Sequence, residues 1–81
     1  MAINFDKIAL EYAKQQGYDT IRNAGEKDGY KYFHYYNLAT LGHKLGLPHI
    51  LKIDDLGRII PVDNFTEIMW ASHQEVLLNN L

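Results

Sequence analysis

The four histidines are the first side chains in this sequence that could do chemistry. No two of them are four residues apart, which is the spacing of paired zinc ligands on one helix face. The pair nearest in sequence, His43 and His49, would need a third ligand from another part of the chain to hold a metal. We therefore expect no metal centre, and keep a site shared by His43 and His49 as an alternative. The four histidines are His34, His43, His49 and His73.

Residues for nucleophilic and acid–base catalysis are equally scarce. The chain has no cysteine, which excludes thiolate nucleophiles, thiol redox chemistry and cysteine-based zinc sites. Ser72 is the only serine, and no Gly-Xaa-Ser-Xaa-Gly elbow surrounds it. Asp54 and Asp55 are adjacent carboxylates in a turn, where such acids usually accept backbone hydrogen bonds. We therefore predict that the protein is not an enzyme, and that it has no catalytic residues and no cofactor.

Length and composition limit the class of protein. With 81 residues, 47% of them hydrophobic and 22% charged, the sequence fits one small folded domain spanning residues 1–81. The absence of cysteine fits a reducing compartment. No apolar run is long enough to cross a membrane, and the first residues lack the pattern of a secretion signal. We expect a soluble, cytoplasmic protein.

Two clear helices are predicted, one near each end of the chain. Asn4 can cap the first, and Gly17 ends it. Asn64 and Glu67 have capping-box spacing at the start of the last. A shorter helix is predicted from Leu38, Leu41 and Leu45, which recur at helical spacing before Gly46 and Pro48. The predicted helices span residues 5–16 and 65 to about 79, and the shorter helix between them has about two turns.

Between the helices, two β-hairpins are predicted. The first joins residues 18–23 to the aromatic run 30–36 through the turn-rich segment 24–29. The second joins residues 49–53 to 58–62 around a turn that ends at Gly57. Pro61 lacks an N–H for a strand ladder, so its strand should lie at a sheet edge. The sequence thus predicts an α+β fold of order α-β-β-α-β-β-α, with helices packed on a small antiparallel sheet.

The last helix has apolar side chains on two sides. At 100° per residue, one stripe is predicted to face the core, and it comprises Phe65, Ile68, Met69, Ser72 and Val76. The second stripe comprises Trp70, Leu77 and Leu81, and one small sheet is not expected to cover both. Exposed apolar patches that contain Trp are typical of contact sites, so we expect self-association through the second stripe. The alternative is that Trp70 packs within its own chain.

The aromatic run 30–36 is the most unusual local composition. Strand alternation places Tyr30, Tyr32 and Tyr36 on the same face as His34, opposite Phe33 and Tyr35. This tyrosine row is expected either as half-exposed sheet surface or as a second protein-contact surface, because tyrosine buries a large area with few rotatable bonds.

Residues 28–35 partly resemble the aromatic octapeptide of RNA-recognition domains, whose rings stack on bases. The resemblance implies RNA binding by the tyrosine row. The sequence departs from that pattern at Asp28, where the family has Lys or Arg, and at Lys31, where it has a small residue. The family also has a strand before its first helix, for which only three residues precede Phe5 here.

Residues 38–48 resemble the first helix and turn of a helix-turn-helix, but the β-branched residues that follow make a poor recognition helix. The net charge of −2 also argues against nucleic acid as the partner. Nucleic-acid binding through residues 30–36 or 38–48 is therefore kept as the alternative. The leading prediction is a non-catalytic protein-interaction module of adaptor, regulator or inhibitor type. A homodimer formed through the C-terminal helix is one form that this module could take. Its predicted contact residues are Trp70, Leu77, Leu81, Tyr30, Tyr32 and Tyr36.

Overall fold

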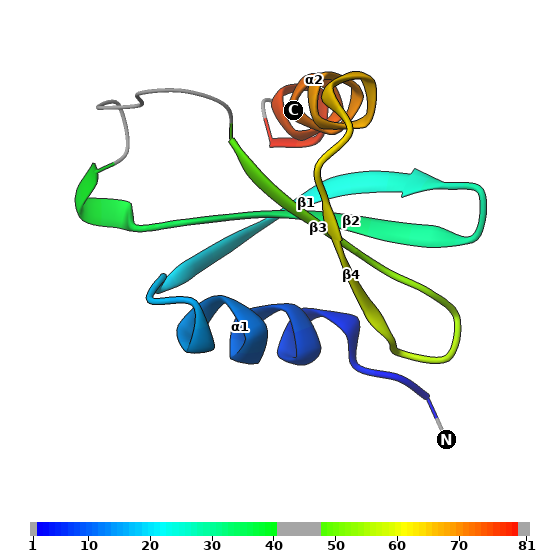
Figure 1. The fold of residues 1–81 in the computed structure, drawn as a ribbon, viewed down its shortest axis with the longest axis horizontal. Coiled ribbons are helices and arrows are strands. Elements are labelled where there is room, and N and C mark those ends of the chain that lie inside the picture. The colour runs from blue at the N-terminus through cyan, green and yellow to red at the C-terminus, as the bar shows by residue number, and fades with distance from the viewer. Residues whose placement is uncertain (1, 41–47, 80–81) are drawn as a thin grey trace.

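The computed structural model describes residues 2–40 and 48–79, and its centre is a four-stranded antiparallel sheet with the strands in sequence order. One helix covers each face of this sheet, which gives three layers (Figure 1). No helix in the described ranges has the length and apolar character needed to cross a membrane. The elements are α1 (Phe5–Gln15), β1 (Thr20–Lys27), β2 (Tyr30–Tyr36), η1 (Leu38–Thr40), β3 (His49–Ile53), β4 (Ile59–Val62) and α2 (Phe65–Asn79).

The hairpin β1–β2 is longer than the sequence predicted. Its two-residue turn is Asp28-Gly29, and both residues have positive φ, 55° and 83°, as a type I′ turn requires. The register between the strands shifts between Asn23 and Glu26, which marks a β-bulge. Gly25 lies in this bulge with φ 97° and donates its N–H to Asn23 Oδ1 at 2.9 Å. Residues 24–27, predicted as part of a turn, therefore continue β1.

The hairpin β3–β4 confirms the predicted turn at Asp54–Gly57. Asp54 Oδ1 accepts the backbone N–H groups of Leu56 at 3.0 Å and Arg58 at 2.8 Å. These hydrogen bonds hold the pKa of Asp54 below its usual value, with the Arg58 backbone N–H as the largest cause. Pro61 lies in β4 at the sheet edge, as predicted.

Helix α1 packs on one face of the sheet with the expected amphipathic pattern. Asn4 caps it by accepting the Lys7 N–H at 3.1 Å, and Gly17 follows its end with φ 90°. Ala9 and Ala13 are fully buried against the sheet. The small alanines allow a close approach between helix and strands. The buried cluster on this face is Ala9, Ala13, Phe33, Tyr35, Leu51 and Ile53.

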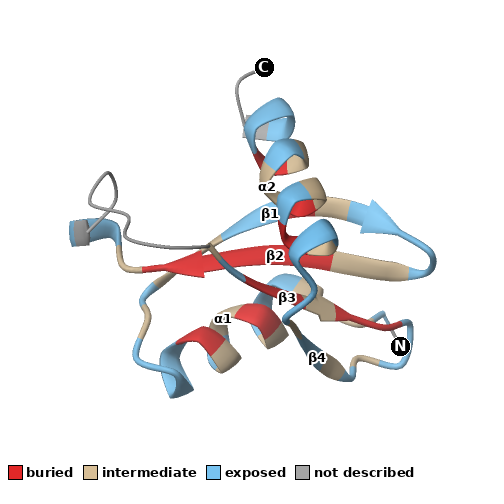
Figure 2. Ribbon diagram, turned by 45° about the horizontal axis from the view of Figure 1, so that its top comes forward, coloured by how far each residue is buried: buried red, intermediate tan, exposed pale blue. Residues whose placement is uncertain are grey.

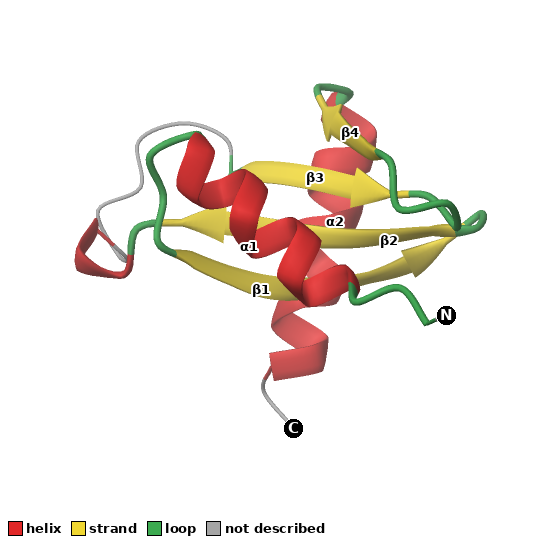
Figure 3. Ribbon diagram, turned by 90° about the horizontal axis from the view of Figure 1, so that it is seen from below, coloured by secondary structure: helices red, strands yellow, loops and turns green. Residues whose placement is uncertain are grey.

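Helix α2 packs on the opposite face and crosses the strands, and its C-terminal end extends past β1 (Figure 3). Asn64 caps it by accepting the Glu67 N–H at 3.1 Å, which confirms the predicted start. Two apolar helix residues, Ile68 and Ala71, are buried against the sheet. The buried cluster on this face is Ala24, Tyr32, Ile50, Ile68 and Ala71. The alternating residues of β2 and β3 thus supply two separate cores.

The segment between the hairpins differs from the prediction. Its described part, Leu38–Thr40, forms a single turn of 3-10 helix, held at its start by the Leu38 N–H, which donates to Asp19 Oδ1 at 3.0 Å. The rest of the predicted helix, residues 41–46, lies outside the described residues, as does His43. The α+β class and the antiparallel sheet are confirmed, and the order established in the described ranges is α-β-β-β-β-α.

Candidate protein-interaction surface

The side of α2 that faces the sheet carries both charged residues of the helix. Glu75 is only 9% exposed, and its Oε2 lies 2.8 Å from Nδ1 of His34, which is 1% exposed. Arg22 approaches the other carboxylate oxygen at 4.0 Å, and its guanidinium lies over the Tyr36 ring. A buried carboxylate is stable only where such partners replace water. This cluster fixes the middle and end of α2 to β1 and β2.

A second polar cluster lies under the first turn of α2. Glu67 Oε2 accepts hydrogen bonds from Lys52 Nζ at 2.9 Å and from the Tyr32 hydroxyl at 2.8 Å. The Lys52 bond is the largest cause that lowers the pKa of Glu67, and the Tyr32 bond is the next. Burial is the main cause that raises the pKa of Tyr32. The neutral Tyr32 hydroxyl therefore remains a donor to the Glu67 carboxylate at physiological pH.

The opposite side of α2 is apolar and open to solvent. Phe65 is 62% exposed, Met69 47%, Val76 55% and Leu77 50%. Figure 2 shows the exposed outer side of this helix above the buried β2 strand. We call the surface formed by these four residues the outer α2 face. The predicted core-facing stripe is therefore wrong at three positions, because Phe65, Met69 and Val76 point away from the sheet and only Ile68 is buried.

Trp70 lies at the flank of this face and packs on its own chain. Its ring makes an edge contact with Tyr32, with centroids 5.0 Å apart, and Lys27 Nζ lies 5.2 Å from its centroid. A Cβ on Gly25 would come within 3.2 Å of the indole, so the bulge glycine makes room for the ring. The indole is half-buried. Of its predicted companions, Leu77 is exposed and Leu81 lies outside the described residues.

The predicted tyrosine surface is largely buried, and α2 covers Tyr32. Tyr32 and Tyr36 are 2% and 7% exposed, and Tyr30 is half-buried with Lys52 Nζ 4.6 Å from its ring centroid. The alternation predicted for the strand is confirmed, but the row is an interior layer of this protomer rather than half-exposed surface. A partner-contact role for Tyr30, Tyr32 and Tyr36 stays a prediction that would require these rings to become more exposed.

Sequence reasoning missed Phe65, Met69 and Val76 as surface residues because a helix was assumed to turn its main apolar stripe inward. A signal was present in Glu67 and Glu75, which lie about 80° apart at 100° per residue and so share one side of the helix. Tyr32, His34 and Lys52, which could satisfy two inward carboxylates, share one face of the sheet. Together these residues could have indicated that α2 packs with its polar side inward.

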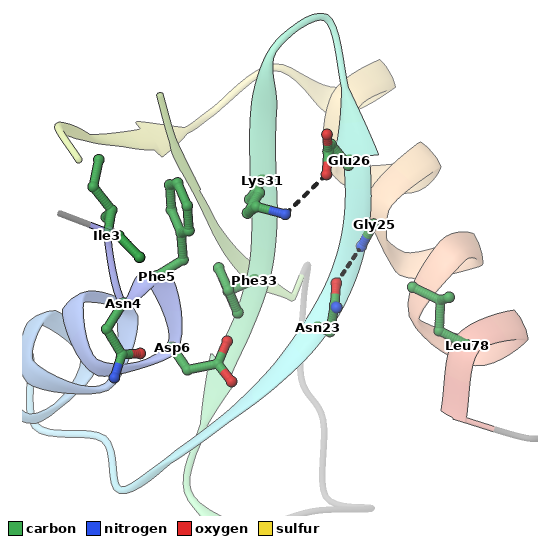
Figure 4. Close-up of a pocket in the computed structure, with 11 residues that line it drawn as sticks. Ile3, Asn4, Phe5, Asp6, Asn23, Gly25, Glu26, Lys31, Phe33 and Leu78 are labelled. Atoms are coloured by element: carbon green, nitrogen blue, oxygen red, sulfur yellow. Dashed lines mark hydrogen bonds and ion pairs between the residues drawn. The ribbon is translucent and has the colours of Figure 1, made fainter. Parts of the chain in front are cut away.

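A hollow of about 740 Å³ lies beside the start of α1, between the N-terminal segment and the β1–β2 hairpin (Figure 4). Its apolar lining includes Ile3 and Phe5. Lys31 Nζ binds Glu26 at 2.9 Å and lies 5.2 Å from the Phe5 ring centroid. This lysine is thus held by groups of its own chain, and the hollow shows no polar arrangement specific for a class of ligand.

The described residues that could bind a metal or act in catalysis do not form a common site. His49 is exposed, and its Nε2 lies 3.0 Å from the Tyr18 hydroxyl. Within residues 2–40 and 48–79, no three His, Asp or Glu side chains gather as metal ligands do. Asp54 is occupied by its turn, as the sequence indicated, and Ser72 lies at the edge of the outer α2 face.

Fold and surface together define a three-layer α+β domain whose second helix directs both its carboxylates at the sheet and leaves large apolar side chains exposed. Comparisons with protein-family models, with curated proteins and with solved structures give no match.

Proposed function

We propose that this chain is a non-catalytic protein-interaction module of the adaptor, regulator or inhibitor class, and that the outer α2 face is its contact surface. The observation that carries this proposal is the reversed polarity of α2. Its two carboxylates, Glu67 and Glu75, are directed at the sheet, while Phe65, Met69 and Val76 are about half exposed or more.

The energetics of such a helix favour a partner. Burying a side chain of this type stabilises a protein by roughly 1.5–3 kcal/mol, and the outer α2 face forgoes most of that gain while it is in water. Placing Glu75 inward adds a desolvation cost that the His34 bond must offset. A contiguous apolar strip at the surface is typical of a protein-contact site.

The nucleic-acid alternative receives no support from the position of the aromatic strand. Stacking on bases requires open ring faces. Tyr32 is buried beneath α2, Tyr36 is buried beside His34, and the half-buried ring of Tyr30 has Lys52 against it. Most of the helix-turn segment 38–48 lies outside the described residues.

Affinity capture from a lysate of the native host tests the proposal. Met69→Glu places a carboxylate in the middle of the outer α2 face, and Gln15→Glu places the same group on the exposed side of α1 as a control. Circular dichroism first establishes that both variants fold. Proteins retained by wild type and Gln15→Glu but lost with Met69→Glu support the proposal. Retention that is identical for all three chains contradicts it.

A further inference from the structure

The outward residues of α2 have the spacing of a helix–helix seam. Successive members are four, three and four residues apart, and this alternation is how two helices pack side by side at a small crossing angle. Ser72, near the middle, is small and half-buried, and its Oγ is shielded from solvent by its own chain. A small residue at that point lets a second helix approach closely. The seam residues are Phe65, Met69, Ser72 and Val76.

Charge favours one kind of occupant for this seam. The only charged residues of α2, Glu67 and Glu75, are bound to side chains of the sheet, so the outer α2 face presents none. A charged partner surface would lose its hydration there without gaining an opposite charge. A second copy of the chain would bring an equally uncharged strip, and the net charge of −2 opposes association only weakly.

The area of the strip is also adequate. The four side chains of the outer α2 face are 47–62% exposed and leave on the order of 400 Å² of apolar surface per protomer. Two copies would hide about 800 Å² of apolar surface, and the adjoining Thr66 and His73 would bring the total toward the ~1,200 Å² at which stable interfaces begin. Both faces of the sheet are already covered by α1 and α2, so the outer α2 face is where a second copy can add a buried layer.

We infer that the outer α2 face binds a second copy of this chain, as an antiparallel α2–α2 pair about a two-fold axis between Met69 and Ser72. This inference rests on the proposed function and names its partner. In an antiparallel pair the bulky Phe65 of one copy packs against the smaller Val76 of the other. The two helix dipoles then run in opposite directions, which is favourable for helices lying side by side. A parallel pair would instead place Phe65 against Phe65.

Sedimentation equilibrium across the micromolar range tests whether the pair forms. We expect wild type and Gln15→Glu to approach twice the 9.4 kDa chain mass, and Met69→Glu to remain a monomer. Each variant interface would bury two unpaired carboxylates, so the dissociation constant should rise by roughly 100-fold or more. A monomeric wild type over the whole range overturns the inference, and so does a Met69→Glu protein that dimerises as wild type does.

Disulfide trapping tests the orientation, and the absence of native cysteine makes it selective. Phe65→Cys and Val76→Cys proteins are mixed and oxidised, with Gln15→Cys as the control partner. If the pair is antiparallel, the main product is the mixed disulfide between Phe65→Cys and Val76→Cys. It should exceed the disulfide-linked homodimer of each variant and every disulfide formed with Gln15→Cys. A predominance of Phe65→Cys homodimers, or equal amounts of all products, contradicts the antiparallel pair.

The two proposals can fail separately. If wild type is a monomer but lysate capture still depends on Met69, the second-copy inference is wrong and the interaction module stands with a different protein partner. If wild type is a monomer and capture is unaffected by Met69→Glu, both are wrong.

Discussion

Helices α1 and α2 cover opposite faces of the same sheet with opposite polarity. In α1 the alanines lie against the strands, while Asp6, Lys7 and Glu11 are exposed. In α2 the two carboxylates lie toward the strands, and large apolar side chains are exposed. Helix α1 packs on the sheet through apolar side chains, whereas α2 packs on it through both carboxylates together with the apolar Ile68 and Ala71. Because hydrogen bonds and ion pairs share in attaching α2, more of its apolar surface is left exposed than on α1.

The comparison requires that α2 be packed on the sheet as stably as α1. Shortening the side chains of two adjacent β3 residues, one on each face of the sheet, tests this. Leu51 is fully buried on the α1 side, and Ile50 is 2% exposed on the α2 side. We expect Leu51→Ala and Ile50→Ala each to lower the free energy of unfolding by about 3 kcal/mol, since each leaves a cavity in a closed core. Urea denaturation measures both. A loss below about 1 kcal/mol for Ile50→Ala alone would mean that α2 covers its face only loosely.

The polar attachment of α2 should give the next largest effect. Glu75→Ala removes the acceptor facing the buried His34, and we expect a loss of about 2 kcal/mol in the free energy of unfolding. Glu11→Ala on the exposed side of α1 should change it by less than about 0.5 kcal/mol. Thermal denaturation followed by circular dichroism compares the two variants. Equal, small effects would show that Glu75 contributes no more than a surface carboxylate.

Local features of the fold could be predicted from the sequence because short-range physics determines them. The caps Asn4 and Asn64 act within three residues of their partners, and the Asp54 turn closes within four. The length of β1 could not be predicted as readily, because the bulge at Gly25 interrupts the strand pattern. In retrospect, Asp28-Gly29 was the stronger hairpin signal.

The direction of α2 could not be obtained from its own sequence pattern. Its inward carboxylates are stabilised by residues far along the chain: His34 lies 41 positions from Glu75, and Tyr32 lies 35 positions from Glu67. Helical periodicity distinguishes the two sides of a helix, but it does not show which side packs against the sheet. Of the described residues in the predicted contact stripe, only Leu77 lies on the outer α2 face.

The smallest expected effect concerns pH and the Glu67 cluster. Lys52 and Tyr32 hold the pKa of Glu67 below its ordinary value of 4.5, so the folded state binds this proton less readily than the unfolded state. The stabilisation is therefore complete above pH 4.5 and is lost as pH falls through the lowered folded-state pKa. Glu67→Gln should be slightly less stable than wild type at neutral pH, and the difference should vanish in acid.

Urea denaturation of both proteins from pH 7 down through the acid range gives this difference directly. Because Glu67 remains 28% exposed and Lys52 17%, solvent screens the pair and the effect should be smaller than that of Glu75→Ala. Asp54 also has a lowered pKa, but it is unchanged in the variant and cancels in the comparison. A difference that stays constant across the titration would mean that the Glu67 charge does not help to hold the first turn of α2 on the sheet.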